Sequence, residues 1–576
     1  MARTAAVGLD NFETIIEGNY FYVDKTDFIR EWWENGDKVT LITRPRRFGK
    51  TLTLSMTEQF FSVNYAGRGE LFRGLSIWKE EKLRALQGSY PVLNLSFAGI
   101  KSSSFATARE MICQEIVRVY MQNRFLLDHD TLALQEKEYF NSISDTMSDA
   151  AASAALNRMS GYLARYYGKN VIILLDEYDT PMQEAYLAGY WEEMLQFTRS
   201  LFHSAFKTNP YLERAILTGI TRVSKESIFS DLNNLKVITV TSPKYAFAFG
   251  FTEEEVFLAL EEYGLSHKKA EVQQWYDGFQ FGSCGHIYNP WSVLNLLAEK
   301  KIAPYWAHTS SNRLIEKLIR ENGAEIKIMM EDLLNGGTRN VTIEEEVAYS
   351  QLDHDADAVW SLFLAGGYLK IDRIQINRRG KEEYTLSLTN RESRAAFDEI
   401  VTGWFSNREL KYDTFTDALL SDNKKYMNEY LNVIAQETFS SFDTGRKVSR
   451  FKQPENFYHG FVLGLIADLR EIYTITSNRE SGDGRYDVLM EPKNAALDDG
   501  IILEFKVQEA PEASLQDTVR AAWKQIFLKK YSAVLEAKGI SKERIRIYGF
   551  AFRGKEVLID GGRYDMLQQK EAAGNE

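Results

Sequence analysis

The sequence predicts an α/β protein with a doubly wound parallel sheet near its N-terminus and a further α/β domain near its C-terminus. Apolar runs at residues 39–43 and 171–175 each end in polar or charged residues, and helical patterns alternate with such runs. Strand-like runs at 486–490 and 501–507, followed by a helical pattern over 515–531, indicate the C-terminal domain. A chain of 576 residues is long enough for about three domains.

The first apolar run leads into a basic loop, Arg44-Pro-Arg-Arg-Phe-Gly-Lys-Thr51, and then into a helical pattern. This strand–loop–helix order is the context that a phosphate-binding loop requires, because N–H groups at the helix N-terminus can cradle phosphates. Lys50 is expected to reach the β and γ oxygens, and Thr51 to hold Mg²⁺. Arg44 occupies the position of the usual first glycine. The predicted nucleotide-binding residues of this loop are Arg46, Arg47, Phe48, Gly49, Lys50, Thr51 and Leu52.

The second apolar run is typical of a strand buried on both faces, and it ends in Asp176-Glu177. Asp176 suits Mg²⁺, and Glu177 suits activation of the attacking water. A third apolar run begins at residue 214, and it predicts Thr218 and Arg222 near the γ-phosphate. ATP and Mg²⁺ are therefore the expected cofactors. Helical patterns between these runs lie at 104–124, 148–167 and 191–208.

Near the C-terminus, carboxylates and a lysine follow the alternation of a strand. Alternate residues share a face, so Glu504 and Lys506 point one way while Phe505 points into the core. Asp487, on the preceding strand-like run, can converge with Glu504 on one Mg²⁺. The metal would lower the pKa of a bound water, and Lys506 would orient that water or stabilise the phosphate. For Glu-x-Lys taken alone, a solvated strand face with a weak ion pair remains the alternative.

The region between these two sites has two open interpretations. Thr252 and Glu255 match a capping box, and the aromatic-rich stretch 275–291 could stack bases, although packing in a core is favoured. Residues 359–371 and a hairpin turning at 377–381 look like a winged helix. Such a unit can serve as a lid over the nucleotide. DNA binding is the alternative, because the wing tip carries three basic residues, Arg378, Arg379 and Lys381.

Composition limits the location and the partners. The chain contains no run of about 18 apolar residues and no signal-peptide core, which argues against a membrane protein. Cys113 and Cys284 cannot build a disulfide scaffold, so a reducing cytoplasmic location is expected. Because the net charge is −12, any positive face for nucleic acid must be local. The candidates on one predicted helix are Arg520, Lys524, Lys529 and Lys530.

The motifs together resemble two known families. The loop Arg44–Thr51 and Leu175-Asp-Glu-Tyr-Asp179 resemble the AAA-ATPase-like family, whose other matching motifs here are Tyr22-Val-Asp-Lys-Thr26, Trp275-Tyr-Asp-Gly278, Tyr288-Asn-Pro-Trp-Ser292 and Tyr305-Trp-Ala-His-Thr-Ser-Ser-Asn312. Members of that family often carry a C-terminal nuclease-like domain. The C-terminal α-β-β-β-α order, beginning with a helical pattern over 455–469, resembles the PD-(D/E)XK nuclease superfamily. This second resemblance implies a catalytic set of Glu455, Asp487, Glu504, Lys506 and Gln525.

The resemblances imply a P-loop NTPase-type sheet with a helical and winged-helix lid, plus a PD-(D/E)XK nuclease-like domain. The expected boundaries are an ATPase domain over 1–250, a lid or connector over 251–405 and a nuclease-like domain over 406–576. The expected function is an ATP-binding switch coupled to a Mg²⁺-dependent phosphodiesterase acting on nucleic acid, DNA rather than RNA. The alternatives are a regulatory ATPase whose nuclease-like domain only binds a partner, and a nucleotide-bound scaffold. A homo-oligomer is left open.

Overall fold

The computed structural model contains two compact units. One comprises Met1–Leu318 and Gly336–Phe397, and the other comprises Ile319–Asn335 and Asp398–Glu576. The structure describes residues 2–222, 232–307, 336–343, 356–377, 380–405, 413–438, 472–481, 484–495, 497–508 and 512–573, with single positions and pairs between these ranges. None of the described helices combines the length and the apolar character that crossing a membrane requires. The three-part division at 250 and 405 stays a prediction.

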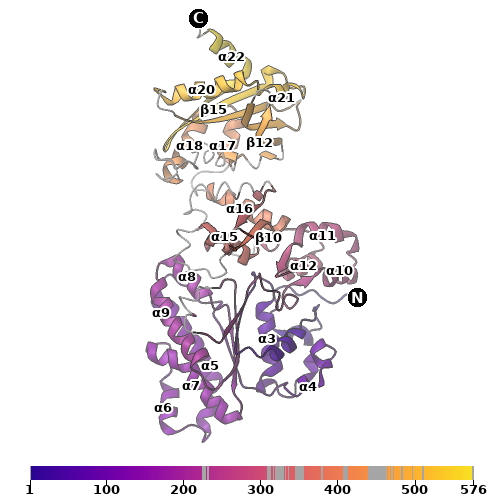
Figure 1. Ribbon diagram of the computed structural model, residues 1–576, viewed down its shortest axis with the longest axis vertical. Helices are drawn as coiled ribbons and strands as arrows, with labels where there is room; N and C mark the ends of the chain where they lie inside the picture. Colours follow the sequence, from indigo (N-terminus) through magenta and orange to yellow (C-terminus); the bar gives the residue numbers. More distant parts are fainter. Residues whose placement is uncertain are drawn as a thin grey trace. The chain divides into compact units, whose positions relative to one another are not determined.

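A five-stranded parallel sheet forms the centre of the first unit, in the order β2-β3-β4-β1-β5. Both β1 and β3 are buried along their whole length, because helices cover both faces of the sheet (Figure 1). The predicted α/β class with a parallel sheet is therefore confirmed. The strands are β1 (Val39–Thr43), β2 (Val92–Ser96), β3 (Val171–Asp176), β4 (Leu212–Gly219) and β5 (Leu235–Ile238).

The helices around this sheet include those predicted from the periodic patterns. The longest are α5 (Phe105–Gln122), α7 (Asp149–Tyr167), α9 (Trp191–Phe202) and α3 (Lys50–Phe61), which begins directly after the basic loop. Serine side chains cap α5 and α7, since Ser104 and Ser148 accept hydrogen bonds from the first turns. The remaining helices are α1 (Phe12–Glu17), α2 (Asp27–Asn35), α4 (Glu81–Arg84), α6 (Leu134–Ser142) and α8 (Thr180–Ala188).

A small helical subdomain follows in the same unit. It contains α10 (Glu253–Glu262), α11 (Lys269–Tyr276), α12 (Pro290–Glu299) and an antiparallel sheet of β6 (Phe251–Thr252), β8 (Cys284–Tyr288) and β7 (Phe279–Phe281). The predicted capping box is present, because Glu255 N donates to Thr252 Oγ1 at 3.3 Å and Thr252 N donates to Glu255 Oε2 at 2.8 Å. Tyr276, Phe279 and Tyr288 are buried, which supports packing as the role of the aromatic stretch.

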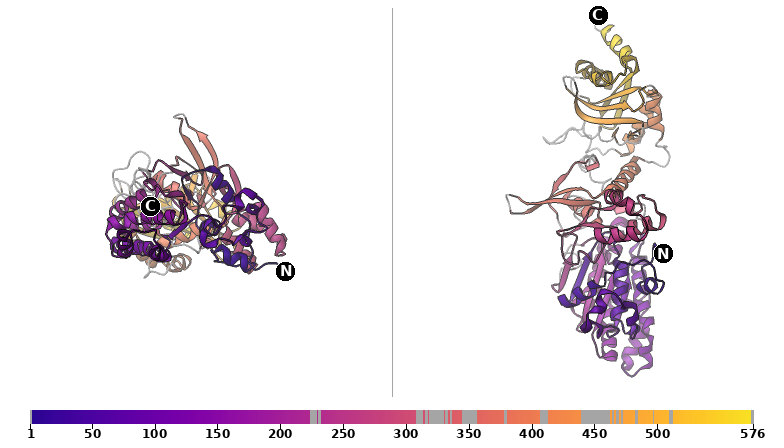
Figure 2. Two further views of the ribbon diagram at one scale, coloured as in Figure 1. Left: turned by 90° about the horizontal axis from the view of Figure 1, so that it is seen from below. Right: turned by 90° about the vertical axis from the view of Figure 1, so that its right-hand side faces the viewer.

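A helix and a three-stranded sheet complete the first unit: α15 (Ala356–Gly366), β10 (Leu369–Ile376), β11 (Glu382–Leu388) and β9 (Arg339–Val341). The predicted hairpin joins β10 to β11 and projects from the body of this unit (Figure 2). On β10 the residues from Asp372 to Ile376 are exposed. Lys381 is exposed as well, whereas Arg378 and Arg379 lie outside the described residues.

A buried carboxylate joins the helical subdomain to α16 (Arg391–Phe405). Glu392 is fully buried and accepts hydrogen bonds from Ser292 Oγ and from the N–H group of Trp306, both at 2.7 Å. Burial raises the pKa of Glu392 to about 7, against the effect of these two donors. The residues of α16 up to Phe397 belong to the first unit, and those from Asp398 belong to the second.

A mixed five-stranded sheet forms the centre of the second unit, in the order β12-β13-β14-β15-β16, with β14 and β15 parallel and the other neighbours antiparallel. Val519, Trp523 and Ile526 of α20 cover one face. The elements are β12 (Tyr473–Ser481), β13 (Gly484–Pro492), β14 (Gly500–Val507), β15 (Ile545–Arg553), β16 (Glu556–Arg563), α17 (Asp413–Leu420), α18 (Lys424–Thr438), α20 (Leu515–Leu528), α21 (Ala533–Glu536) and α22 (Tyr564–Ala573).

Three sequence predictions need correction or lie beyond the structure. The helix predicted over 515–531 ends at Leu528, because Lys529 caps it and Lys530 turns the chain with φ +50°. Lys529 and Lys530 therefore follow the helix that carries Arg520 and Lys524. β13 spans Gly484–Pro492 and is therefore longer at both ends than the strand-like run predicted over 486–490. Glu455 and most of the helix predicted over 455–469 lie outside the described residues.

Arg44, which stands at the start of the basic loop, turns into the core and not toward the helix N-terminus. Its guanidinium is fully buried and donates to the carbonyl oxygens of Thr43 (2.9 Å), Thr239 (2.7 Å) and Lys244 (3.2 Å). The guanidinium carbon lies 4.3 Å from the centre of the Phe281 ring. Burial lowers the pKa of Arg44 to about 9. The side chain thus anchors the loop to the end of β1 and to the segment that follows β5.

We expect Arg44→Ala to lower the free energy of unfolding of the first unit by about 3 kcal/mol, because buried carbonyl oxygens lose a charged donor. Arg44→Lys should recover little of this loss, since a lysine ammonium cannot donate in the same directions as the planar guanidinium group. Urea unfolding followed by tryptophan fluorescence measures both effects. Arg73→Ala, at an exposed arginine, is the control and should change the value by less than about 0.5 kcal/mol. An unchanged unfolding midpoint in Arg44→Ala would contradict a stabilising role of the buried Arg44 side chain.

Candidate active sites

A cavity of about 540 Å³ in the first unit lies over the N-terminus of α3. Charged and polar residues line it, among them Lys50, Thr51, Asp176 and Glu177. Apolar residues line it as well: Leu9, Ile15, Val23, Met56, Phe251 and Leu294. The volume falls within the range of small-molecule sites. A ligand that carries both anionic and apolar groups matches this mixed lining.

The basic loop holds the Lys50 ammonium at the N-terminus of α3. Lys50 is 5% exposed, and its Nζ donates to the carbonyl oxygens of Arg44 and Pro45, both at 3.0 Å. Gly49 precedes the helix with φ +80°, a conformation that glycine adopts without strain. Burial lowers the pKa of Lys50, whereas Glu177 and Asp176 favour its charged form. The ammonium and the first N–H groups of α3 together favour an anion at this position.

Asp176 joins three elements at the carboxyl edge of the sheet. Thr51 Oγ1 of α3 donates to Asp176 Oδ2 at 2.6 Å, and Thr218 Oγ1 of β4 donates to Asp176 Oδ1. Burial raises the pKa of Asp176, against the effect of these two hydroxyl groups. A hydroxyl and a carboxylate at this spacing offer the oxygen ligands that Mg²⁺ prefers. The structure thus brings Thr51, Asp176 and Thr218 together beside Lys50.

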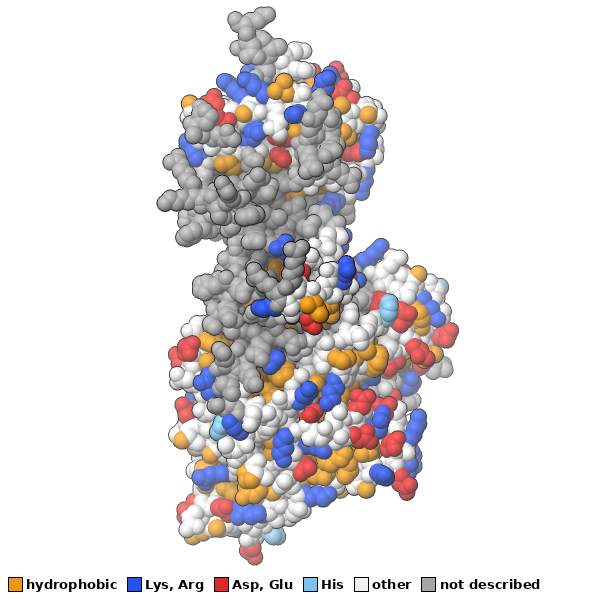
Figure 3. All heavy atoms as spheres, in the orientation of Figure 1, with side chains coloured by type: hydrophobic (Ala, Val, Ile, Leu, Met, Phe, Trp, Pro, Cys, Tyr) orange, Lys and Arg blue, Asp and Glu red, His pale blue; other side chains and the backbone are white. Residues whose placement is uncertain are grey.

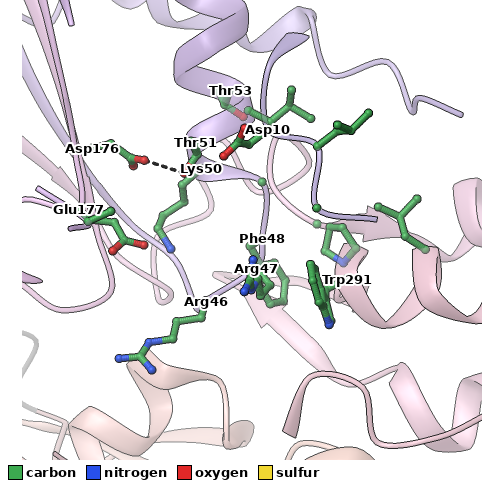
Figure 4. A pocket seen from close by; sticks show the side chains of 18 of the residues that line it. Asp10, Arg46, Arg47, Phe48, Lys50, Thr51, Thr53, Asp176, Glu177 and Trp291 are labelled. Atoms are coloured by element: carbon green, nitrogen blue, oxygen red, sulfur yellow. Dashed lines mark hydrogen bonds between the residues drawn. The ribbon is translucent and has the colours of Figure 1, made fainter. Parts of the chain in front are cut away.

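Glu177 points into the same part of the cavity as Lys50 (Figure 4). Its backbone has φ +49°, and its Oε2 accepts a hydrogen bond from Thr180 Oγ1 at 3.1 Å. Of the residues after β4, Ile220 lines the cavity. Arg222, predicted as a γ-phosphate sensor, is half-buried two residues further along and is not among the described residues that line the cavity.

The other loop residues divide their roles. Arg46 and Arg47 line the cavity, and the Arg47 guanidinium carbon lies 4.1 Å from the centre of the Trp291 ring (Figure 4). The Phe48 side chain is buried against Phe279, with 4.8 Å between ring centres, so only its backbone can contact a phosphate. Leu52 also lines the cavity. The contact between Arg47 and Trp291 links the loop to α12. The sequence analysis did not predict this contact.

A second cluster lies in the second unit, where β13, β14 and α20 meet. Val488 pairs with Leu503 in the antiparallel ladder, so Asp487 and Glu504 follow at adjacent positions on one face. Asp487 Oδ2 accepts a hydrogen bond from the N–H group of Phe505 at 2.8 Å. Burial raises the pKa of Asp487, while the Phe505 N–H group and the Lys506 charge lower it. Asp487 and Glu504 thus share one face of the sheet, and the Lys506 charge acts on Asp487.

Gln525 brings α20 into this cluster. Its Nε2 donates to Glu504 Oε1 and also to the hydroxyl of Tyr531 at 3.3 Å. Glu504 is only 1% exposed. Burial raises the pKa of Tyr531, and the charges of Glu504 and Asp487 add to this effect. Tyr531 was missed by the sequence analysis, because only the turn after α20 brings it back toward Gln525. Glu455 lies outside the described residues, so its place beside this cluster stays a prediction.

Comparisons with known proteins match a family model to each of the two regions that carry these clusters. Residues 6–229 match the family model described as predicted AAA-ATPase, and residues 453–561 match that of the PD-(D/E)XK nuclease superfamily. The chain is 29% identical over 401 residues to the "uncharacterized protein in vnfD 5′ region" of Azotobacter chroococcum mcd 1. The aligned region covers 68% of this chain and 69% of the relative. The two resemblances stated from the sequence are thereby confirmed.

Proposed function

Because the chain carries an AAA-ATPase-like domain and a domain of the PD-(D/E)XK nuclease superfamily, we propose that it is an ATP-binding switch coupled to a metal-dependent nuclease. The observation that carries the first half is the convergence of Lys50, the Thr51–Asp176 pair and Glu177 on one cavity. A cationic residue, an oxygen ligand pair and a carboxylate base are the groups that phosphoryl transfer to water needs.

In the proposed ATPase site, Lys50 neutralises the β and γ oxygens, while N–H groups of the loop hold the phosphates. Thr51 and Asp176 would hold Mg²⁺, which supplies charge neutralisation to the leaving phosphate. Glu177 accepts a proton from the attacking water. Thr218 orients Asp176 through its hydroxyl. Arg46, Arg47, Leu52 and the backbone of Phe48 complete the nucleotide contacts.

In the proposed nuclease site, Asp487 and Glu504 would hold Mg²⁺, which activates water for attack on a phosphodiester. Lys506 acts on the water or on the phosphate, and Gln525 orients Glu504. Glu455 is proposed as a further member of this set. On the face drawn in Figure 3, basic and acidic side chains are interspersed, so the positive surface for nucleic acid would be local. Arg520 and Lys524, both exposed on α20, supply one such surface.

Coupling between the two activities is part of this proposal. Bound ATP can change nuclease activity only if it binds one arrangement of the protein more tightly than another. Thr218, on β4, and Arg222, three residues after β4 ends, are the residues that we propose to sense the γ-phosphate. We also propose a cytoplasmic protein that acts on DNA rather than RNA, built from an ATPase domain, a lid over 251–405 and a nuclease-like domain from residue 406. A homo-oligomer is compatible with this proposal.

One observation favours a second candidate, a regulatory ATPase whose nuclease-like domain only binds a partner. Glu504 is almost wholly buried and already engaged by Gln525, so a substrate phosphate would need this cluster to open. Metal-dependent cleavage of DNA or RNA by the purified protein separates the two candidates, because a binding domain would not cleave under any condition.

For ATP, we expect Lys50→Ala to weaken binding by at least about 100-fold, since each lost charge-assisted hydrogen bond is worth about 1.5–3 kcal/mol. Glu177→Gln should keep the affinity and lose hydrolysis, because an amide cannot accept the proton of water. Calorimetric titration with ATP and Mg²⁺, together with phosphate release, measures both. Lys79→Ala removes an exposed lysine and is the control. Unchanged ATP affinity in Lys50→Ala would rule out this site.

For cleavage, we expect Asp487→Ala and Glu504→Ala to lose metal binding and activity together. Lys506→Ala should keep the metal and lose turnover, since its charge acts on water and phosphate. Titration with Mg²⁺ beside a cleavage assay on DNA and RNA separates these effects. Lys493→Ala, at an exposed lysine just after β13, is the matched control. Cleavage by Glu504→Ala at the wild-type rate would show that the site is wrong.

A further inference from the structure

Asp179, two residues after Glu177, has no part in the chemistry proposed above, yet its carboxylate is almost fully buried and one of its oxygens accepts four hydrogen bonds. Its Oδ2 accepts hydrogen bonds from Ile220 N (3.0 Å), Thr221 N (2.9 Å), Thr221 Oγ1 (2.8 Å) and Gln183 Nε2 (3.1 Å). Three of these four donors belong to the turn that follows β4. A surface acid that only caps α8 would not need to be buried against this turn.

Neighbouring groups extend this contact into a clamp between residues 177–179 and residues 218–221. Tyr178 N donates to Thr218 O at 2.9 Å, and the Tyr178 hydroxyl donates to Thr221 O at 2.8 Å. Glu177 N donates to Thr218 Oγ1 at 3.4 Å. With the three bonds from the turn to Asp179, six hydrogen bonds join the two segments.

Gly219 makes the close approach of the two segments possible. A β-carbon at this position would lie 2.6 Å from Asp179 Oδ1 and 2.8 Å from the Tyr178 ring, both closer than van der Waals contact allows. The carbonyl oxygen of Gly219 also accepts a hydrogen bond from Arg44 N at 3.1 Å. The clamp therefore connects the loop before α3, the end of β4 and the segment that carries Glu177.

Glu177 sits between the anchored ends of this segment. On one side Asp176 is held by the hydroxyl groups of Thr51 and Thr218, and on the other side Asp179 is held by the turn. The φ of +49° at Glu177 is sparsely populated for a residue with a β-carbon, and such a conformation persists only where the surroundings impose it. The carboxylate that points into the cavity thus depends on both anchors.

We propose that Asp179 is the positioning residue that holds Glu177 in its reactive orientation, so that it sets the rate of ATP hydrolysis and not the affinity for ATP. This inference rests on the proposed ATPase function. Asp179 acts through the backbone of Glu177 and the turn at Ile220, and it touches neither nucleotide nor metal. An electrostatic role is the competing explanation, because Asp179 also favours the charged form of Lys50, although Glu177 and Asp176 do so more strongly.

The test compares kcat and KM for ATP hydrolysis in the full-length protein with Mg²⁺. Asp179→Ala should lower kcat by about 10- to 100-fold, the effect of a small misplacement of a reacting group, with KM within about threefold. Asp179→Asn should stay within about threefold of the wild-type kcat, since its carbonyl oxygen can still accept from the turn. Gly219→Ala should resemble Asp179→Ala, because the added methyl group would push the carboxylate away.

Asn209→Ala is the control for general loss of stability. Asn209 is a buried polar residue of the same unit that donates to Ser160 Oγ and Ala205 O, away from the cavity lining. This variant should unfold more easily and keep kcat within about twofold. If Asp179→Ala does not fold, the comparison of Gly219→Ala with Asp179→Asn gives the same answer.

The outcomes separate this inference from the proposal on which it rests. Hydrolysis by the wild-type protein with unchanged kcat in Asp179→Ala and Gly219→Ala would overturn the positioning role alone. A tenfold or larger rise of KM in Asp179→Asn would also overturn it, in favour of the electrostatic role. No hydrolysis by the wild-type protein would overturn the proposed ATPase function and the positioning role with it.

Discussion

The arrangement of residues around the first unit's cavity depends on the hydrogen bonds that the Asp176 carboxylate accepts. It accepts hydrogen bonds from Thr51 on α3 and Thr218 on β4 while it stands at the end of β3. In this way one buried side chain sets the spacing of three elements around the Lys50 ammonium. The parallel sheet makes this arrangement possible, because the carboxyl ends of its strands meet at one edge.

Burial of charge at this edge has a physical consequence. Lys50, Asp176, Asp179 and Arg44 are all buried, and desolvation acts against the charged form of each one. Backbone carbonyl oxygens accept hydrogen bonds from Lys50 and Arg44, while hydroxyl and N–H groups donate to the two aspartates. Hydrogen-bonded polar networks of this kind restrain their side chains, so Lys50 and Asp176 are held before any ligand binds.

Much of this arrangement could be predicted from local patterns. The apolar run before Asp176 and the strand–loop–helix order around Lys50 identified the parallel sheet and part of the cavity lining, namely the loop residues, Asp176 and Glu177. Thr218 and Arg222, which were also predicted there, are not among the described residues that line the cavity. The alternation of Glu504 and Lys506 correctly placed both residues on β14. These signals are local because strand periodicity and turn chemistry act over a few residues.

Other features depend on contacts between segments far apart in the sequence. Arg44 turns into the core because the carbonyl oxygens of Thr239 and Lys244 receive it, and nothing near residue 44 encodes this. The contact of Tyr531 with Gln525 depends on where α20 ends, and the clamp at Asp179 depends on the turn after β4. No periodic pattern in a single sequence reports such pairings.

The central claim is that the nucleotide state of one unit controls the chemistry of the other. The most direct measurement is the rate of DNA cleavage by the full-length protein at fixed Mg²⁺, with ATP, ADP, a non-hydrolysable ATP analogue or no nucleotide. A rate that differs between ATP and ADP, with the analogue resembling ATP, is the result that this account predicts. Equal rates under all four conditions, zero included, would contradict it.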